Sequence, residues 1–268
     1  MGWVRRELDA LSIPPLKRFG QHFLIDKKVR ENLVQLAGLT PQDTVLEVGP
    51  GLGFLTAALV TKASRLIAVE KDRTLAGYLT TKFASNTNLT VTEGDVLKIE
   101  LPDFTKVVSS PPYNISSKLI LLLLNSRFKR AVLLLQQEFV GRLMAPSGTR
   151  EYGRLTVMFQ SRAQATAASR VPSSAFFPRP RVESTIAIIE PKANPPEIHN
   201  MTVFTDLVRA LFTQRRRKLR GVLIRYLKYK YTELPLLHEQ APLMEKRVFE
   251  LSPEELADLS NQITDKVS

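Results

Sequence analysis

Short apolar runs alternate with helix-like stretches along the chain from residue 28 onward. Runs rich in Val, Ile and Leu predict buried strands at residues 44–48, 65–70, 89–95, 106–110 and 131–136. The intervening segments FLTAALVTKA and TLAGYLTTKF carry their apolar residues at helical spacing. Strand–helix alternation of this kind predicts an α/β fold with a doubly wound, mostly parallel, Rossmann-like sheet.

Two later apolar runs extend this sheet. Residues 155–169 and 181–190 are separated by little more than a Pro-rich loop, so we expect them to pair as an antiparallel edge hairpin. The segment PKANPPEIHN (191–200) then marks a domain boundary. We therefore predict a first domain over residues 1–192 and a small, helical, basic domain over residues 193–268.

The pattern beyond this boundary is helical. Apolar side chains recur at steps of three and four residues, at Leu219, Val222, Leu223, Tyr226 and Leu227. In the later segment LSPEELADLSNQI, the first serine is a predicted N-cap and the proline takes the first helical position. The second glutamate of that segment completes a capping box.

The charge of the chain indicates an anionic partner, nucleic acid first. The formal net charge is +12, and residues 205–230 hold nine basic residues against one acid. The absence of cysteine excludes disulfides and thiolate metal sites, and the three histidines are far apart in sequence, which argues against a His-based metal site. The longest apolar run, Leu119–Leu124, is too short to span a membrane, and no signal peptide is recognisable. A cytoplasmic protein is expected.

Glycines follow the first predicted strand in the segment VLEVGPGLGFLT. Gly49, Gly51 and Gly53 permit a tight turn and a close approach of a ligand to the backbone at the start of a helix. The dinucleotide fingerprint requires a glycine where Phe54 stands, and the Gly-Lys-Ser/Thr of a phosphate loop is absent. An ordinary strand-to-helix turn is the alternative for the glycines alone.

Two acids follow at the ends of the next predicted strands. Glu70 stands where a carboxylate accepts hydrogen bonds from both ribose hydroxyls, and Asp95 where one accepts from an adenine amino group. Either acid by itself is more simply a surface loop residue. Together they predict an adenosine pocket at the topological switch point of the sheet.

The segment SSPPYNISS ends the fourth predicted strand, because proline cannot extend a central strand. It offers the Pro111 carbonyl as an acceptor and the Tyr113 ring as a stacking surface, two groups that suit an extruded base. For Pro-Pro-Tyr alone, a turn with a packed tyrosine is the alternative.

From about residue 17 to residue 260, the chain resembles the KsgA-type small-subunit rRNA adenine N6,N6-dimethyltransferases, a group of class I methyltransferases. The resemblance rests on RFGQHFL, LEVGPGLGFLT, SPPYNISS, FFPRPRVEST, FTQRRRKLRGVL and RVFELSPEELADL, which occur in the family's order. It implies S-adenosylmethionine as cofactor and, as substrate, adenosines near the 3′ end of small-subunit rRNA in the assembling small ribosomal subunit. It also implies that FTQRRRKLRGVL forms the first basic helix of the C-terminal domain. A monomer is expected.

The resemblance also implies roles for single residues. His22, where the family usually has Asn, and Leu24 would line the methionine end of the cofactor, and Gly49 and Gly51 would approach it through their backbone. Glu70 would bind the ribose, Asp95 the adenine, and Phe176 would be a second aromatic ring near the target base. Ser110 stands where the family has an Asn that accepts from the target amine, so the catalytic set would be Ser110, Pro111, Tyr113 and Phe176, with Ser110 also near the cofactor.

Beside such a core, the basic segment is best interpreted as phosphate-binding rather than as a solvated helix face or a nuclear import signal. The candidate contacts are Arg215, Arg216, Arg217, Lys218 and Arg220. Two alternatives to the main interpretation stay open. One is a large-subunit rRNA adenine methyltransferase. The other is a non-catalytic assembly or transcription factor of the same fold, which Ser110 favours.

Overall fold

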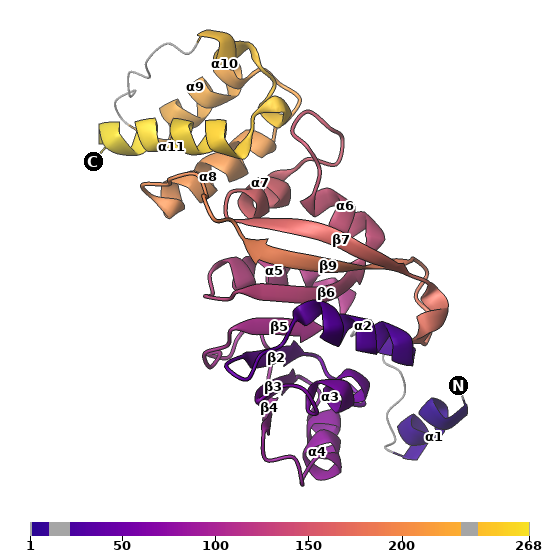
Figure 1. The fold of residues 1–268 in the computed structure, drawn as a ribbon. Coiled ribbons are helices and arrows are strands. Elements are labelled where there is room, and N and C mark those ends of the chain that lie inside the picture. The colour runs from indigo at the N-terminus through magenta and orange to yellow at the C-terminus, as the bar shows by residue number, and fades with distance from the viewer. Residues whose placement is uncertain (1, 11–21, 232–240, 268) are drawn as a thin grey trace. The chain divides into compact units, whose positions relative to one another are not determined.

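The computed structural model describes residues 2–10, 22–231 and 241–267 (Figure 1). The chain divides into two compact units. We call residues 1–140 with 165–191 the sheet unit, and residues 141–164 with 192–268 the helical unit. Within the described ranges, no helix has the length and apolar content that crossing a bilayer requires.

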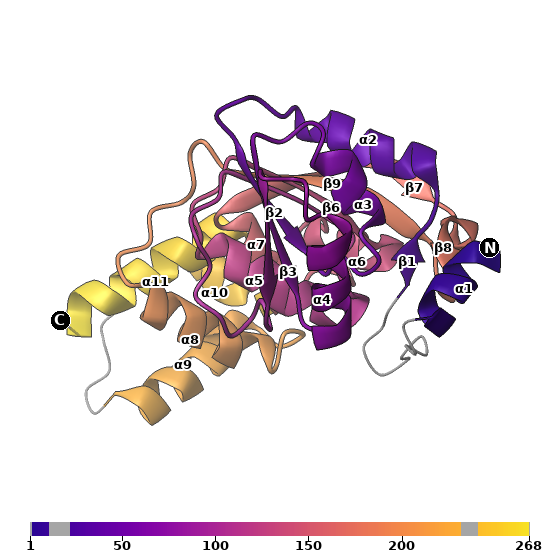
Figure 2. The ribbon, with the colours of Figure 1, turned by 90° about the horizontal axis from the view of Figure 1, so that it is seen from below.

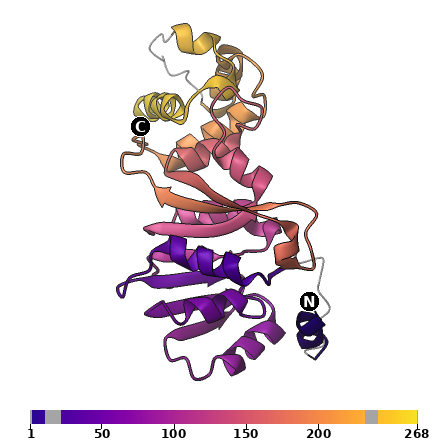
Figure 3. The same ribbon diagram turned by 45° about the vertical axis from the view of Figure 1, so that its right-hand side comes forward.

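A seven-stranded sheet forms the centre of the sheet unit, in the order β4-β3-β2-β5-β6-β9-β7 (Figures 1 and 3). The strands are β2 (Thr44–Val48), β3 (Arg65–Glu70), β4 (Leu89–Glu93), β5 (Lys106–Ser109), β6 (Arg130–Gln136), β7 (Ala163–Val171) and β9 (Ser184–Pro191). The neighbours from β4 to β6 pair in parallel, and β9 runs antiparallel to β6. The predicted doubly wound, mostly parallel sheet is confirmed, and the two later runs supply its last two strands.

Helices cover both faces of this sheet (Figures 1 and 2). On one face lie α2 (Lys27–Ala37), α3 (Phe54–Leu59) and α4 (Arg73–Lys82), and on the other lies α5 (Ser116–Leu124), which follows the 3-10 turn η2 (Tyr113–Ile115). Strand β6 is buried on both faces from Ala131 to Leu135, as expected for a central parallel strand. This double burial explains why its sequence is continuously apolar instead of alternating.

A second, two-stranded sheet connects the two chain segments of the sheet unit, residues 1–140 and 165–191. Strand β1 (Phe23–Leu24) pairs antiparallel with β8 (Phe176–Phe177), which follows the 3-10 turn η3 (Ser173–Ala175). Helix α1 (Gly2–Ala10) buries Val4 and Leu8 in a cluster that includes Phe23 of β1. The pairing brings residues 23–24 of the RFGQHFL motif to the start of FFPRPRVEST, whereas residues 18–21 of the first motif lie outside the described ranges.

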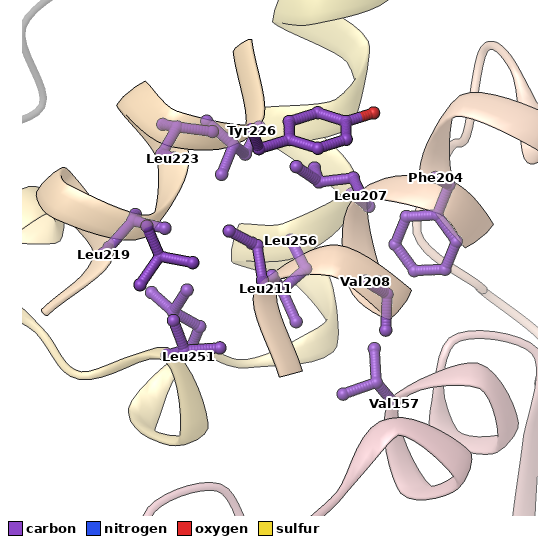
Figure 4. Close-up of a cluster of buried hydrophobic side chains, with 14 of the residues drawn as sticks. Val157, Phe204, Leu207, Val208, Leu211, Leu219, Leu223, Tyr226, Leu251 and Leu256 are labelled. Carbon is purple, nitrogen blue, oxygen red and sulfur yellow. The ribbon is translucent and has the colours of Figure 1, made fainter. Parts of the chain in front are cut away.

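The helical unit is built around a separate apolar core (Figure 4). Its elements are α7 (Arg154–Gln160), α8 (Met201–Phe212), α9 (Leu219–Lys230), α10 (Ala241–Glu245), the 3-10 turn η4 (Val248–Glu250) and α11 (Pro253–Val267). All five residues of the predicted repeat in 219–227 are buried in this core. Ser252 and Glu255 form the predicted capping box of α11, since each backbone N–H donates to the other side chain, at 2.9 and 3.1 Å.

Residues 154–160 are helical, so the prediction of a strand from residue 155 is wrong for its first half. Val157 and Met158 are buried against the core of the helical unit, and that packing selects a helix for a short apolar run that periodicity leaves ambiguous.

The same packing explains a second difference. Residues 141–164 belong to the compact unit of the C-terminal helices instead of the predicted first domain, whereas the later division, after Pro191, lies next to the predicted boundary. Helix α6 (Gln137–Leu143) includes the point at which the first unit ends.

Candidate nucleoside and base site

The switch point of the sheet lies between β2 and β5, where the strand order reverses. Backbone pairing of these strands runs through Leu46 and Val107. Beyond it, the Ser109 hydroxyl donates to the Val48 carbonyl at 2.6 Å. The glycine turn and the SPPY segment therefore begin side by side at the carboxyl edge of the sheet, the position at which open α/β sheets bind ligands.

The glycine turn after β2 requires glycine for both conformation and space. Gly49, Gly51 and Gly53 have φ values of 67°, 59° and 76°, in the left-handed region. A Cβ on Gly51 would lie 2.9 Å from the Phe23 ring, and one on Gly49 would lie 3.0 Å from the Pro112 ring. The turn is thus packed between the N-terminal motif and the SPPY segment.

Glu70, at the end of β3, fixes this turn. Its carboxylate is 6% exposed and accepts from the backbone N–H groups of Gly51 and Asp72, at 3.0 and 2.9 Å. Burial raises its pKa above the ordinary value, while these two N–H groups favour the ionised form. A carboxylate offers about four lone-pair sites, so acceptor capacity remains for a ligand hydroxyl beside these N–H groups.

Asp95 lies two residues beyond the end of β4, the strand that pairs with β3. Its carboxylate forms an ion pair with Lys71 at 3.0 Å and accepts from the Leu97 N–H at 3.1 Å. The hydrogen bond from Lys71 lowers the pKa of Asp95, so the group is an ionised acceptor at neutral pH. Gly94 donates its N–H to the Glu70 carbonyl, which keeps the two acids next to each other.

Glu47 is a site residue that the sequence reasoning did not select. It lies on β2, is 1% exposed, and lines the same cavity as Glu70. Burial raises its pKa to about 8. Hydrogen bonding from Thr56 opposes this rise by favouring the ionised form. Among the described residues, the Oε2 atom of Glu47 has no hydrogen-bond partner. The sequence feature that marks Glu47 is its position as the one ionisable residue in the strand TVLEV.

The SPPY segment lines the same cavity as the acids. Ser110 is half-buried, Pro111 is buried, and the half-buried Tyr113 forms a hydrogen bond with the Ser184 hydroxyl at the start of β9. Phe176, expected as a second aromatic ring near a base, is fully buried. Its ring meets Tyr113 edge to face, with centroids 6.4 Å apart, so it supports the Tyr113 ring and offers no face of its own.

His22 directly precedes β1, and β1–β8 pairing places it near the loop that follows β8. Its Nδ1 atom is 2.7 Å from the Pro178 carbonyl oxygen. The imidazole also lies beside the Tyr113 ring, with centroids 5.8 Å apart and planes inclined by 31°. His22 is therefore fixed between the Pro-rich loop and the SPPY segment.

One cavity connects these groups. Of the candidate residues, His22, Leu24, Gly49, Glu70, Asp95, Ser110, Pro111 and Tyr113 line it, whereas Gly51 and Phe176 do not. Gly51 contributes through its bond to Glu70, and Phe176 through its contact with Tyr113. Across the part of the chain that the structure describes, no cluster of three potential metal ligands occurs.

The basic segment of the helical unit differs from the expected helix. Residues 213–218 form a turn between α8 and α9, so only Arg220 of the five candidate residues lies on a helix. The segment 246–249 holds this turn through backbone hydrogen bonds, which prevent α9 from extending back through it. The Arg215 guanidinium donates to the Tyr152 and Arg150 carbonyls at 2.6 and 2.8 Å, a structural role.

Lys218 and Arg220 share the exposed Glu245, at 2.6 and 3.8 Å. Arg216 and Arg217 are exposed, and within the described ranges neither forms an ion pair. Among the five, these two are the exposed cations for which the described part of the chain supplies no ion-pair partner.

A family model described as ribosomal RNA adenine dimethylase matches residues 16–265 of the chain. Two curated relatives are described as probable ribosomal RNA small subunit methyltransferase A. The one from Methanosarcina mazei is 41% identical, over 92% of this chain and 92% of the relative. The one from Thermococcus onnurineus is 40% identical, over 90% of this chain and 89% of the relative.

Two solved structures share the arrangement over almost the whole chain. A dimethyladenosine transferase from Plasmodium falciparum has a TM-score of 0.80 at 27% identity, covering 92% of this chain and 98% of that one. The 23S rRNA methyltransferase ErmE has a TM-score of 0.67 at 28% identity, covering 90% of this chain and 99% of that one.

Proposed function

This chain belongs to the ribosomal RNA adenine dimethylase family, and we propose that it methylates N6 of two adjacent adenosines near the 3′ end of small-subunit rRNA, to the dimethyl stage, during assembly of the subunit. The observation that carries this function is the single cavity at the switch point. It combines two acids suited to a nucleoside with the Pro111 carbonyl and Tyr113 ring suited to a base.

S-adenosylmethionine is the proposed cofactor, and it supplies a methyl group bonded to a positively charged sulfur. The chain's own residues fit such a cation. The Oε2 atom of Glu47 has no hydrogen-bond partner among the described residues, and burial keeps this carboxyl protonated near neutral pH until a cationic ligand beside it favours the ionised form. Glu70 and Asp95 supply acceptors for the ribose hydroxyls and the adenine amine.

The proposed role of the SPPY segment is to hold the target amine. Delocalisation of the N6 lone pair into the purine ring makes N6 a weak nucleophile. Acceptance of its N–H groups by the Pro111 carbonyl and the Ser110 hydroxyl favours a pyramidal nitrogen with an available lone pair. The Tyr113 ring, supported by Phe176 and Ser184, would stack on the base. Catalysis of this kind depends on positioning and electrostatics.

Arg216 and Arg217 are the proposed phosphate contacts of the helical unit. Lys218 and Arg220 would join them when an RNA phosphate replaces the Glu245 carboxylate as their ion-pair partner. This assigns RNA binding to residues within the predicted 193–268 domain. The proposed substrate is the rRNA of the assembling small subunit, and the enzyme would act as a monomer in the cytoplasm, where such subunits are assembled.

Transfer of tritiated methyl groups from S-adenosylmethionine to undermethylated small subunits tests this function. We expect label in N6,N6-dimethyladenosine after digestion of the rRNA. Label in large-subunit RNA alone would indicate the other branch of the family. Cofactor binding without any transfer would indicate a non-catalytic assembly factor, the alternative that Ser110 favours.

A further inference from the structure

We propose that Lys82 is a positioning residue of the cofactor site, whose ammonium group holds the glycine turn from outside the cavity, and that helix α1 orients it through Glu7 and Tyr78. This inference rests on the proposed function, because it concerns the affinity for S-adenosylmethionine. It assigns part of that affinity to residues that do not line the cavity. Helix α1 also lies outside residues 16–265, the range that the family model matches.

Lys82, the last residue of α4, binds a carbonyl oxygen of the glycine turn. Its Nζ atom donates to the Leu52 carbonyl at 2.9 Å. Leu52 directly follows Gly51, whose N–H donates to Glu70. The turn is therefore held by a side chain of α4 as well as by the side chain at the end of β3. Leu52 is fully buried and does not line the cavity, so the bond from Lys82 leaves the ligand space free.

Three aromatic rings fix the direction of the Lys82 side chain. The residue as a whole is exposed, yet its Nζ atom lies 5.0, 5.6 and 5.7 Å from the ring centroids of Tyr78, Phe54 and Phe83. Attraction between a cation and aromatic faces at such distances favours this position over solvent. Phe54 lines the cavity directly after the turn, so the ammonium group packs against a residue of the cavity wall.

Helix α1 supplies the other end of this arrangement. The Tyr78 hydroxyl donates to the Glu7 carboxylate at 3.3 Å, and the Lys82 Nζ atom donates to the same hydroxyl at 3.1 Å. A hydroxyl donates one proton and accepts at the same time, so these bonds form a continuous chain from Glu7 to the Leu52 carbonyl.

Apolar contacts keep α1 beside the turn. Val4 and Leu8 are fully buried, and they share one hydrophobic cluster with Leu52 and Phe54. These two partners flank Gly53, the residue that precedes α3. Helix α1 therefore packs against the same part of the turn that Lys82 binds, and its apolar side chains hold Glu7 within reach of Tyr78.

The glycine turn needs such support because its backbone is intrinsically free. Gly49, Gly51 and Gly53 have positive φ values, and glycine loses more conformational entropy on ordering than any other residue. A turn that is already ordered in the free protein costs the cofactor less to bind. Loss of the Lys82 bond should therefore weaken cofactor binding, while the reacting atoms keep their geometry once the cofactor is bound.

Replacement of Lys82 tests this separation of binding from chemistry. In K82M we expect calorimetry to show S-adenosylmethionine binding weakened about three- to tenfold. The single-turnover rate at saturating cofactor and RNA should stay within about twofold of the wild type. K82R keeps a cationic donor and should bind the cofactor more tightly than K82M. Lys62→Met, exposed in the turn after α3, removes the same charge and should change neither quantity.

Two further variants test the contribution of α1. Tyr78→Phe keeps the ring and loses both hydrogen bonds, and Glu7→Ala removes only the acceptor on α1. Each should weaken cofactor binding about two- to fivefold in the wild type and have little further effect in the K82M background, because the chain acts through Lys82. Asp9→Ala, exposed on the same helix, is the matched control. Urea unfolding verifies that each variant is folded; a purely structural role would lower stability and leave the affinity of the folded protein unchanged.

Four results would each overturn the inference. They are a cofactor affinity of folded K82M within about twofold of the wild type, a K82R affinity no better than that of K82M, a saturated rate that falls as much as the affinity, and additive effects of Glu7→Ala and K82M. If K82M does not fold, the affinity of Tyr78→Phe decides by the same limit.

Failure of the proposed function would look different. A wild type that binds no S-adenosylmethionine overturns both the function and this inference. A wild type that binds the cofactor without transferring methyl groups overturns the function alone, and the affinities of the variants then decide the inference. If the wild type binds and transfers, the four results above bear on the inference alone.

Discussion

The backbone N–H of Gly51 donates to Oε2 of Glu70 at 3.0 Å and joins the glycine turn after β2 to the end of β3. The carboxylate is almost fully buried, and its other oxygen accepts from Asp72. One side chain therefore both holds the turn and offers lone pairs to a ligand. We therefore expect its loss to lower stability as well as ligand binding, whereas the loss of Asp95 should affect mainly binding.

Glu70→Ala should weaken S-adenosylmethionine binding about tenfold or more and lower the free energy of unfolding by about 1–3 kcal/mol, because the buried Gly51 N–H loses its partner. Asp95→Ala should weaken binding similarly with a smaller effect on stability, since its ion pair with Lys71 is partly exposed. Calorimetry and urea unfolding measure the two quantities. Glu93→Ala, at the paired register position on β4 but exposed, is the matched control. Unchanged affinity in both variants would place the cofactor elsewhere.

Glu47 should make stability depend on pH. Its pKa is raised from 4.5 to about 8 by burial, so between these values the unfolded chain has lost a proton that the folded protein keeps. Stability therefore falls as the pH rises through this window, by up to about 1.4 kcal/mol per pH unit. Glu47→Gln should remove this slope in urea unfolding at pH 5 and pH 8, and the exposed Glu100→Gln should not. Equal slopes in all three proteins would show that Glu47 ionises normally.

Tyr113→Ala should abolish most methyl transfer and change S-adenosylmethionine affinity little, because a stacked base is worth about 1–3 kcal/mol. Tyr113→Phe keeps the ring and loses only the hydrogen bond to Ser184, so it should behave like Ser184→Ala and retain most activity. Single-turnover rates and calorimetry measure the two effects. A comparable loss of cofactor affinity in Tyr113→Ala would assign the ring to the cofactor.

Ser110→Asn should raise the methylation rate of the wild type. An amide oxygen reaches further than the serine hydroxyl and carries two lone pairs for the target amine. Single-turnover assays on undermethylated small subunits provide the measurement, and Ser110→Ala, which removes the acceptor, should lower the rate. A slower Ser110→Asn enzyme would mean that the hydroxyl, or a water bound to it, is the functional acceptor.

Arg216→Gln combined with Arg217→Gln should weaken RNA binding and flatten the dependence of log affinity on log salt by about 0.7–0.9 per lost phosphate contact. Arg215→Gln should instead lower the stability of the helical unit, since its guanidinium bonds the Tyr152 and Arg150 carbonyls. A double replacement of the exposed Arg127 and Lys129, just before β6, controls for net charge. An unchanged salt slope in the Arg216 and Arg217 variant would show that the turn is an ordinary solvated surface that does not contact phosphate.

Local rules determined the central sheet and much of its chemistry. Buried parallel strands require continuous apolar runs, so β2, β3 and β6 were predicted almost to the residue. The capping box of α11 depends only on Ser252 and Glu255, three residues apart, and it forms as predicted. Gly49, Glu70, Asp95 and Tyr113 follow strand ends, and parallel strand ends meet at one edge, so their shared cavity was also predictable.

Tertiary packing decided what sequence spacing leaves open. The run at 155–160 is apolar enough for a strand, but burial of Val157 and Met158 in the helical unit makes it a helix. Phe176 is buried beneath Tyr113 and Arg215 is bonded to backbone carbonyls, so neither presents the surface expected of it. Within the described ranges, Oε2 of Glu47 is left without a hydrogen-bond partner, whereas Nδ1 of His22 contacts the carbonyl oxygen of Pro178, 156 residues further along the chain. Their chemistry depends on which distant groups the chain brings within hydrogen-bond distance, which local sequence rules do not encode.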